Sequence, residues 1–370
     1  MEMDWIANRK DICVKNRLIG LDMLKIFATI SIVLHHYQDI MAANYGNAVV
    51  PFKLGYFSLS VELFFMISGY LMHGYMQKIS DGLSFPDFFK KRFLRFFPLL
   101  LICTLTMTVF ARIFFLQNGS HYAGVDGYSL WTILVTSLGI QEGWGIPNPG
   151  INNPTWYISY LLLCYVVFYF LTYLSKRLDF NCIYAYALMI FVGISKLNMA
   201  FNSEIPFLNG RGYTCFFWGL VLAHLFRRFR AGKTAKCLAW SALCSLASVS
   251  MITWMFSPGH WLHWLVMKDL RFILIFIYYP CLMFLSTSRP LHMPVMSRIV
   301  SSLGKISFDV YVWHAPLFLI MFVAFKAFNI TYDVCTPKAM VMFAMVCYLV
   351  GTVSYWAIEK PLGKILGSSR

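Results

Sequence analysis

The sequence predicts an all-α integral membrane protein that crosses the bilayer about ten times. Of its 370 residues, 59% are hydrophobic and only 13% are charged, whereas a soluble domain carries about 25% charged residues. Apolar stretches of about 20 residues, the length that spans a bilayer, recur along nearly the whole chain. Aromatic residues gather near the ends of these stretches, where Tyr and Trp favour the membrane interface. We therefore expect one transmembrane domain over residues 1–370 and no soluble domain.

Ten stretches are long and apolar enough to be transmembrane helices. The segment 129–140 is apolar but too short to cross, so we expect it to lie at the interface or to re-enter within a long outer loop, 118–155. That loop is rich in Gly, Pro and Asn, which argues against a continuous helix. The ten predicted spans are approximately 18–40, 53–76, 97–117, 156–174, 181–200, 210–226, 237–256, 265–286, 305–326 and 338–357.

Positive charges indicate the orientation. Most of the 31 Lys and Arg residues fall on one side if the N-terminal segment 1–17 is cytoplasmic, as the positive-inside rule requires. The C-terminal tail 358–370 is then cytoplasmic as well. A crossing at 129–140 would invert the later loops and expose the basic cluster Arg227–Arg230, which is why we expect ten spans and not eleven. Charged and imidazole side chains interrupt the first apolar stretch, which favours an uncleaved first helix over a signal peptide.

Several function classes are disfavoured by composition and motifs. The net charge of +15 is explained by basic loops beside a membrane, and no soluble domain is expected that would present a basic face to nucleic acid. The ten Cys residues contain no CxxC pair and mostly lie in apolar stretches, so we expect neither a disulfide framework nor a metal site. The sequence contains no P-loop, GxSxG or HExxH motif.

Ionisable residues inside predicted spans are the first candidates for function, because burying them in a membrane is costly. His35 and His36 lie near the outer end of the first span. Adjacent helical residues point about 100° apart, so we expect only one of them to face a given pocket; the alternative is that both are interfacial. Glu62, near the middle of the second span, needs an imidazole or guanidinium partner, in either a structural or a catalytic role. His314 lies near the middle of the ninth span, close to Pro316, which frees a backbone carbonyl.

Basic residues at the ends of spans form the second group of candidates. Arg92 and Arg95 are three residues apart in a cytoplasmic segment, so they share one helical face. They either extend to anionic lipid or clamp a phosphate, which Arg pairs bind with fixed bidentate geometry. Arg211 lies at the outer mouth of the sixth span, and Trp156 begins the fourth span at the same level.

Six sequence blocks, taken together and in order, resemble acyltransferase family 3, which includes the polysaccharide and lipopolysaccharide O-acetyltransferases. In that family a basic residue precedes an essential His by eleven positions, as Lys25 precedes His36 here, although the family more often has Arg in place of Lys. The other five blocks are Ser60–Tyr70 with Glu62, Arg92-Phe93-Leu94-Arg95, Asn153-Pro154-Thr155-Trp156-Tyr157, Ser307–Pro316 with His314, and Glu359-Lys360-Pro361.

The resemblance implies an enzyme that moves an acyl group, usually acetyl, from cytosolic acyl-CoA to a hydroxyl of a glycan beyond the membrane. The glycan is a polysaccharide, an O-antigen or a lipid-linked sugar, and the location is the bacterial cytoplasmic (inner) membrane. His36 is then the general base or a transient acyl carrier, and Glu62 orients it. Arg92, Arg95 and Lys25 bind the donor. Further pocket candidates are His314, Arg211, Trp156, Tyr311 and Ser68.

Two other function classes stay open on the sequence alone. A transporter or channel for a small polar solute would use the same charged residues to line a path, without any dependence on CoA. A non-catalytic sensor would recognise acyl-CoA or lipid without turnover. The acceptor hydroxyl, the acyl group beyond "short" and the oligomeric state are not encoded in any motif.

Overall fold

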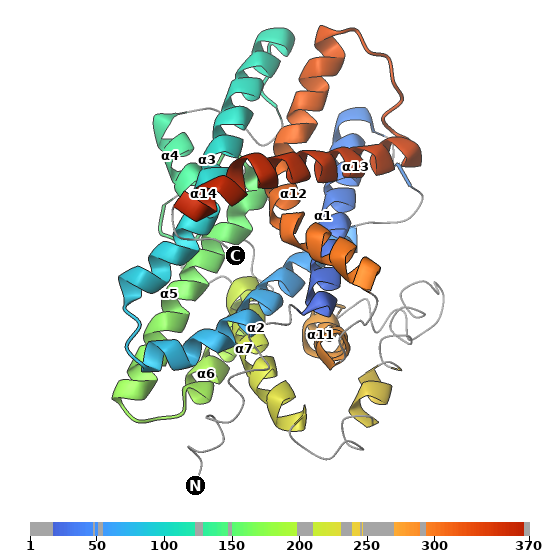
Figure 1. The fold of residues 1–370 in the computed structure, drawn as a ribbon. Coiled ribbons are helices and arrows are strands. Elements are labelled where there is room, and N and C mark those ends of the chain that lie inside the picture. The colour runs from blue at the N-terminus through green and yellow to red at the C-terminus, as the bar shows by residue number, and fades with distance from the viewer. Residues whose placement is uncertain are drawn as a thin grey trace. The chain divides into compact units, whose positions relative to one another are not determined.

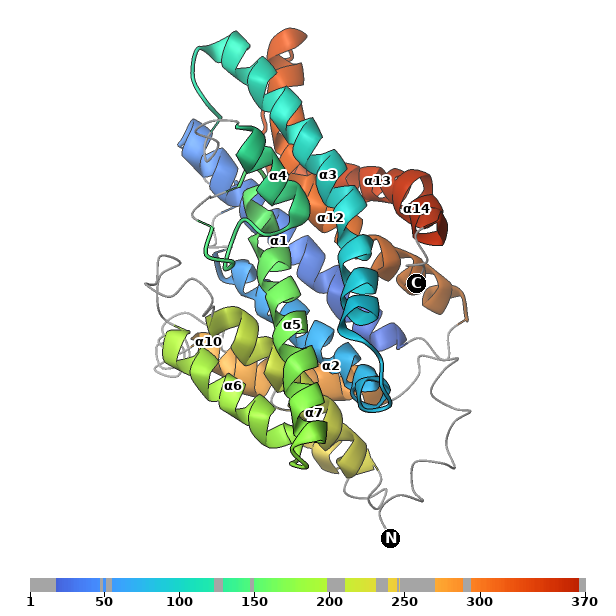
Figure 2. The same ribbon diagram turned by 90° about the vertical axis from the view of Figure 1, so that its left-hand side faces the viewer.

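The computed structural model describes residues 18–46, 49–50, 55–122, 129–146, 150–197, 210–230, 239–244, 246, 270–288 and 294–365. Within these residues every regular element is helical (Figures 1 and 2). The chain divides into two compact units, of which the first comprises 1–27 and 235–305 and the second comprises 28–234 and 306–370. Each unit is described by itself.

The second unit contains most of the helices. It holds the greater part of α1 (Ile19–Tyr45) and of α12 (Pro294–Ala327), whose first residues belong to the first unit. Its other elements are η2 (Gly55–Leu59), α2 (Ser60–Ser80), α3 (Phe85–Asn118), α4 (Leu130–Leu138), η3 (Asn153–Thr155), α5 (Trp156–Arg177), α6 (Cys182–Lys196), α7 (Gly210–Arg230), α13 (Pro337–Ser354), the π-helical turn η5 (Tyr355–Glu359) and α14 (Lys360–Ile365).

Helices α2 and α7 pack with their backbones in direct contact. A Cβ atom on Gly69 of α2 would collide with the Phe216 carbonyl, and one on Gly219 of α7 would collide with the Met66 carbonyl. Glycine is therefore required at both positions for this close approach. Helix α6 runs beside α7 (Figures 1 and 2). The tight packing fixes the start of α7 against the start of α2, where two of the candidate site residues lie.

Helix α3 begins earlier than expected. Ser84 caps its N-terminus by accepting a hydrogen bond from the Asp87 amide, and Pro86 occupies the first turn, where its missing N–H costs nothing. Arg92 and Arg95 therefore lie in the first turns of a 34-residue helix and not in a loop. Helix α4 packs beside α3 (Figure 2) and has only nine residues, about 14 Å at ~1.5 Å per residue. That length agrees with the expectation that 129–140 does not cross a membrane.

Helix α12 packs against α1 and α13 in the second unit. The Phe318 ring of α12 stacks on Phe343 of α13 with centroids 4.0 Å apart, and Tyr37 of α1 lies against both rings. The Tyr37 hydroxyl also donates to the Val334 carbonyl at 2.8 Å. These contacts hold the second half of α1 and the middle of α12 side by side.

The described part of the first unit contains the start of α1, α10 (Leu270–Ile273), the π-helical turn η4 (Leu274–Tyr278), α11 (Tyr279–Ser288) and the start of α12. Gly20 packs directly on the backbone of Ser286, and Gly304 packs on the side chain of Asp22. These two close contacts bind the start of α1 to α11 and to α12 within this unit.

The described residues contain seven helices that are long and apolar enough to cross a membrane. They coincide with seven of the ten predicted spans, and the predicted span 181–200 corresponds to the shorter apolar helix α6. Predicted span 210–226 is helical as α7 but is not one of the seven. Most of span 237–256, the N-terminal segment 1–17 and the end of the tail lie outside the described residues. The count of about ten and the cytoplasmic placement of both termini therefore stay predictions.

Candidate functional site

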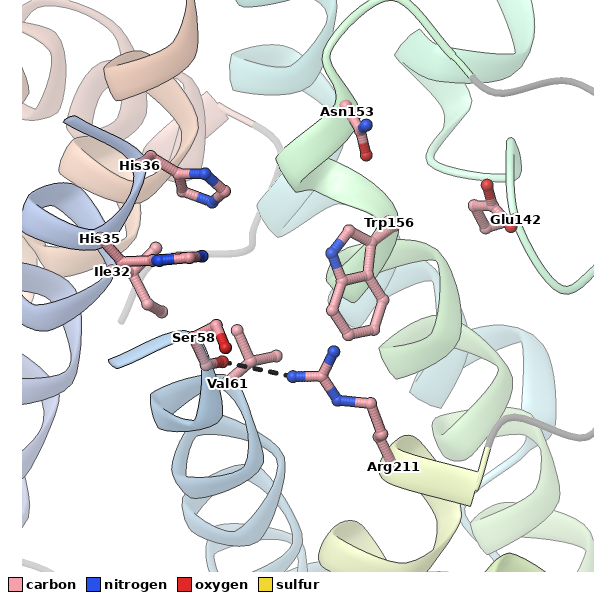
Figure 3. A pocket seen from close by; sticks show the side chains of 9 residues that line it. All are labelled: Ile32, His35, His36, Ser58, Val61, Glu142, Asn153, Trp156 and Arg211. Atoms are coloured by element: carbon pink, nitrogen blue, oxygen red, sulfur yellow. Dashed lines mark hydrogen bonds between the residues drawn. The ribbon is translucent and has the colours of Figure 1, made fainter. Parts of the chain in front are cut away.

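A pocket of about 370 Å³ lies where α1 meets the N-terminal ends of α2, α5 and α7 in the second unit (Figure 3). This volume suits a small ligand or one part of a larger one, since small-molecule sites typically measure ~300–1,000 Å³. The pocket is lined by Ile32, His35, His36, Ser58, Val61, Glu142, Asn153, Trp156 and Arg211.

Three histidine rings stand in a row at one wall of this pocket. The centroids of His35 and His36 are 4.9 Å apart, and those of His36 and His314 are 5.1 Å apart with the planes at 25°. His314 is fully buried. Both His35 and His36 line the pocket, so the expectation that only one of them would face it is wrong. The wall is wide enough to include both side chains. The ring of His35 also lies 3.4 Å from the Asp39 carboxylate.

The backbone of α12 fixes the protonation pattern of His314. Its Nδ1 atom is hydrogen-bonded to the carbonyl of Tyr311. A carbonyl only accepts, so Nδ1 carries the proton and Nε2 is left with a free lone pair. The Nε2 atom is buried and has no hydrogen-bond partner among the residues that the structure describes. His314 therefore places a second imidazole, whose Nε2 can accept a proton, directly against the ring of His36.

The carbonyl freed by Pro316 is satisfied by a loop. Proline has no N–H, so the carbonyl of Val312, four residues earlier, lacks its helical donor. The side-chain amide of Asn152 donates to this carbonyl at 3.2 Å in a fully buried position. From the residue directly before Val312, the Tyr311 hydroxyl donates to the carbonyl of Pro154. The loop before α5 is thus fixed to the helix that carries His314.

Glu62 forms an ion pair with Arg211. The guanidinium donates from Nε to Oε1 at 2.8 Å and from one Nη to Oε2 at 3.0 Å, which is a bidentate ion pair. The same side chain also donates to the Ser58 carbonyl at 3.2 Å and lies 4.9 Å from the Trp156 ring centroid (Figure 3). A guanidinium matches both carboxylate oxygens at once, so Arg211 is the main partner of Glu62, and the orientation of His36 by Glu62 stays a prediction.

The position of Glu62 along its helix also differs from the expectation. It is the third residue of α2 and the eighth residue of the candidate span Gly55–Ser80, which includes the turn η2, so it lies nearer one end of that span than its middle. Glu62 therefore lies at the same end of the bundle as Arg211 and Trp156. The expectation that Arg211 and Trp156 share one level is confirmed by their contact.

Arg92 and Arg95 lie together on one face of α3, as the spacing predicts. The Arg92 guanidinium carbon is 4.2 Å from the Tyr75 ring centroid and 6.0 Å from that of Tyr165, and the corresponding Arg95 atom is 5.5 Å from the Phe96 centroid. The Nε atoms of both arginines are buried without a hydrogen-bond partner among the described residues. Both guanidinium groups stack on aromatic rings and keep N–H groups that have no acceptor in the described part of the chain. Such a pair is well placed to bind an anion.

Aromatic side chains connect the arginine pair to the histidine row. Tyr157 and Tyr165 are buried side chains about two turns apart on α5, and the Tyr157 ring lies 5.7 Å from that of Tyr311. The Tyr311 ring in turn lies 5.7 Å from His314. The Ser68 hydroxyl is 3.2 Å from the Tyr157 hydroxyl, so Ser68 contacts this connection and is not a lining residue of the pocket.

Lys25 lies in the first unit, where its ammonium is 3.1 Å from a carboxylate oxygen of the buried Asp22. Its predicted role in donor binding stays a prediction. No group of three or more His, Cys, Asp or Glu side chains in the described part of the chain is arranged to hold a metal ion.

Sequence reasoning missed Glu142, Asn152 and the participation of His35. Glu142 lies in the irregular segment between α4 and η3, where a carboxylate next to a glycine looks like any solvated turn residue. The Glu142 side chain is in fact partly buried and lines the pocket, and this burial raises the pKa of its carboxyl. Asn152 directly precedes the block Asn153–Tyr157, so that block carried a partial signal.

One comparison with known proteins identifies a family. A family model described as an acyltransferase domain matches residues 18–358. The chain belongs to acyltransferase family 3. No curated protein and no solved structure matches the chain. Membership in acyltransferase family 3 confirms the resemblance drawn from the six sequence blocks, and it makes the protein a membrane acyltransferase by family.

Proposed function

We propose that the protein transfers an acyl group, most simply acetyl, from acyl-CoA to a hydroxyl of a glycan across the bacterial cytoplasmic membrane. The observation that carries this proposal is His36, an imidazole that lines a pocket of about 370 Å³ and stacks on a second, buried imidazole. Family membership supplies the reaction class. The donor, the acceptor and the membrane side are part of the proposal.

His36 acts on the acceptor hydroxyl. As a general base it takes the hydroxyl proton while the oxygen attacks the thioester carbonyl. The carbon–sulfur bond then breaks, and the CoA thiolate leaves and is protonated to the thiol. Alternatively, His36 first takes the acyl group itself and the hydroxyl attacks the acyl-imidazole. Incubation with labelled donor alone separates the two routes, because only the second leaves label on the protein.

Arg92 and Arg95 bind the donor phosphates at the other end of the aromatic connection. Their buried, unpartnered Nε atoms support this role, because phosphate oxygens are strong acceptors for guanidinium N–H groups. Tyr75 stacks on Arg92 and limits the positions that this guanidinium can adopt. The acyl-pantetheine arm then reaches from the arginine pair towards His36 within the second unit.

The proposal is tested by transfer of radiolabelled acetyl from acetyl-CoA in membrane vesicles that contain the full chain and the envelope glycans of the host. We expect His36→Ala to abolish transfer. The matched control His121→Ala changes an exposed histidine three residues after α3 and should leave transfer unchanged. Undiminished transfer by folded His36→Ala protein would overturn the assignment. Solute uptake without any acetyl transfer would favour a transporter instead.

A further inference from the structure

The backbone of Glu142 is held in place by a single side chain. The Ser159 hydroxyl of α5 accepts from the Glu142 amide at 3.1 Å and donates to the Glu142 carbonyl at 2.6 Å. The next residue, Gly143, has φ +80° and packs so closely on the Tyr160 ring that no side chain would fit there. A carboxylate is thus set on a rigid turn at the edge of the pocket, which is how binding groups are pre-organised.

The Glu142 carboxylate is not used to hold the fold together. Its side chain lines the pocket, yet among the described residues its hydrogen bonds involve only its main chain and no salt bridge includes it. A carboxylate that is partly removed from water and lacks a partner is costly. Such a group is typical of a binding site that is completed by a ligand.

Glu142 gives the lining of the pocket a negative charge that no neighbouring group of the described residues balances. The positive charge of Arg211 is neutralised by the bidentate pair with Glu62. A neutral His36 adds no charge, and His35 already faces the acidic Asp39. Glu142 is then the uncompensated charge of the lining. It lies across the pocket from His35 and His36, with Trp156 and Asn153 between (Figure 3), so a ligand whose hydroxyl is at His36 extends towards it.

We propose that Glu142 selects the acceptor by its charge: with Asn153 it binds hydroxyl or amino groups of a neutral or cationic sugar, and it rejects acidic sugars. The proposal rests on the proposed function only in taking a glycan as the acceptor. The carboxylate oxygens accept hydrogen bonds from sugar hydroxyls, and the Asn153 amide both donates and accepts. An acidic sugar would place a like charge next to the carboxylate, which disfavours binding.

The test measures direct binding of three methyl glycosides to the full chain in lipid nanodiscs by saturation-transfer NMR at neutral pH. The probes are the methyl glycosides of glucose, glucosamine and glucuronic acid, which are neutral, cationic and anionic. We expect the wild-type protein to bind the glucosamine probe about tenfold or more tightly than the glucuronic acid probe, the scale of one modest charge interaction. Glu142→Gln should remove most of this difference, and Glu142→Lys should reverse it.

The control is Asp333→Lys, the same charge reversal in an exposed segment before α13. This variant should bind the three probes in the same order of affinity as the wild type. The proposal is overturned if Glu142→Lys leaves the order of the probe affinities unchanged. It is also overturned if none of the three probes binds. The acetyl-transfer assay is independent of this result. If transfer is absent but Glu142 still sets the order of binding, the proposed reaction fails and the charge selection stands; if transfer persists with an unchanged order, only the charge selection fails.

Discussion

Arg211 shows how one side chain serves several contacts at the pocket. Its guanidinium binds both oxygens of Glu62, a backbone carbonyl at Ser58 and the face of Trp156. Glu62 is completely buried, and removal of one partner from a buried ion pair typically costs ~3–5 kcal/mol. Arg211 therefore positions the indole and the start of α2, and the pair adds no net charge to the pocket.

A single-residue test separates donor binding from chemistry. We expect Arg92→Ala to raise the KM for acetyl-CoA roughly 10- to 100-fold, the value of one charged hydrogen bond, and to leave kcat nearly unchanged because ground-state binding is lost. Steady-state transfer kinetics with varied acetyl-CoA measure both constants. The control Arg112→Ala removes an exposed arginine of the same helix and should not change KM. A fall in kcat at unchanged KM would contradict the donor role of Arg92.

Glu142→Gln should stabilise the protein at neutral pH. Burial raises the pKa of this carboxyl in the folded state, so the folded protein binds the proton more tightly than the unfolded chain. Glu142 therefore lowers the free energy of unfolding as pH rises above its unfolded pKa, and it costs nothing below that pH, where both states are protonated.

Thermal unfolding of purified wild-type and Glu142→Gln protein across this pH range measures the effect. The Tm advantage of the variant should be present at neutral pH and disappear in acid. Equal Tm values at every pH would show that the carboxylate is not destabilising.

Among the elements, α12 and the loop before α5 are joined at the backbone hydrogen bond that Pro316 removes from α12. Pro316 leaves the Val312 carbonyl without a helical donor, and Asn152 supplies one. Removal of the amide leaves a buried acceptor unsatisfied, which costs ~1–3 kcal/mol.

Asn152→Ala should therefore lower Tm in the wild-type background and have much less effect in a Pro316→Ala background, where residue 316 regains an N–H for the carbonyl. Thermal unfolding of the four proteins of this double-mutant cycle measures the coupling. Equal effects of Asn152→Ala in both backgrounds would contradict the link.

The elements also show what the sequence predicts and what it does not. Apolar length located the seven long apolar helices of the described residues, and the spacing of Arg92 and Arg95 placed them on one face. The start of α3 was missed because the Ser84 cap and Pro86 extend the helix into a polar segment that hydropathy assigns to a loop. The partner of Glu62 was missed because Arg211 is 149 residues away, and a contact at that separation depends on the packing of α2 on α7.

For the whole molecule, orientation depends on the distribution of positive charge. With ten crossings, both termini and the basic cluster Arg227–Arg230 are cytoplasmic, and the segment 129–146 is outside. Green fluorescent protein fused at the C-terminus should fluoresce, and alkaline phosphatase fused after residue 145 in a truncated chain should be active. An active phosphatase at the C-terminus would contradict an even number of crossings.

The attachment of the pocket loop to α12 has a consequence for changing the acceptor. Residues 150–156 are fixed to the helix that carries His314 through Asn152 and Pro154, so exchange of this stretch would disturb the reacting centre. Glu142 belongs to the preceding stretch, where its backbone is held by Ser159 of α5, while its neighbour Gln141 donates to Thr155 at 2.7 Å and so belongs with the attached loop. An engineer who wishes to redirect the enzyme to another sugar should therefore exchange 142–146 and keep Gln141 together with 150–156.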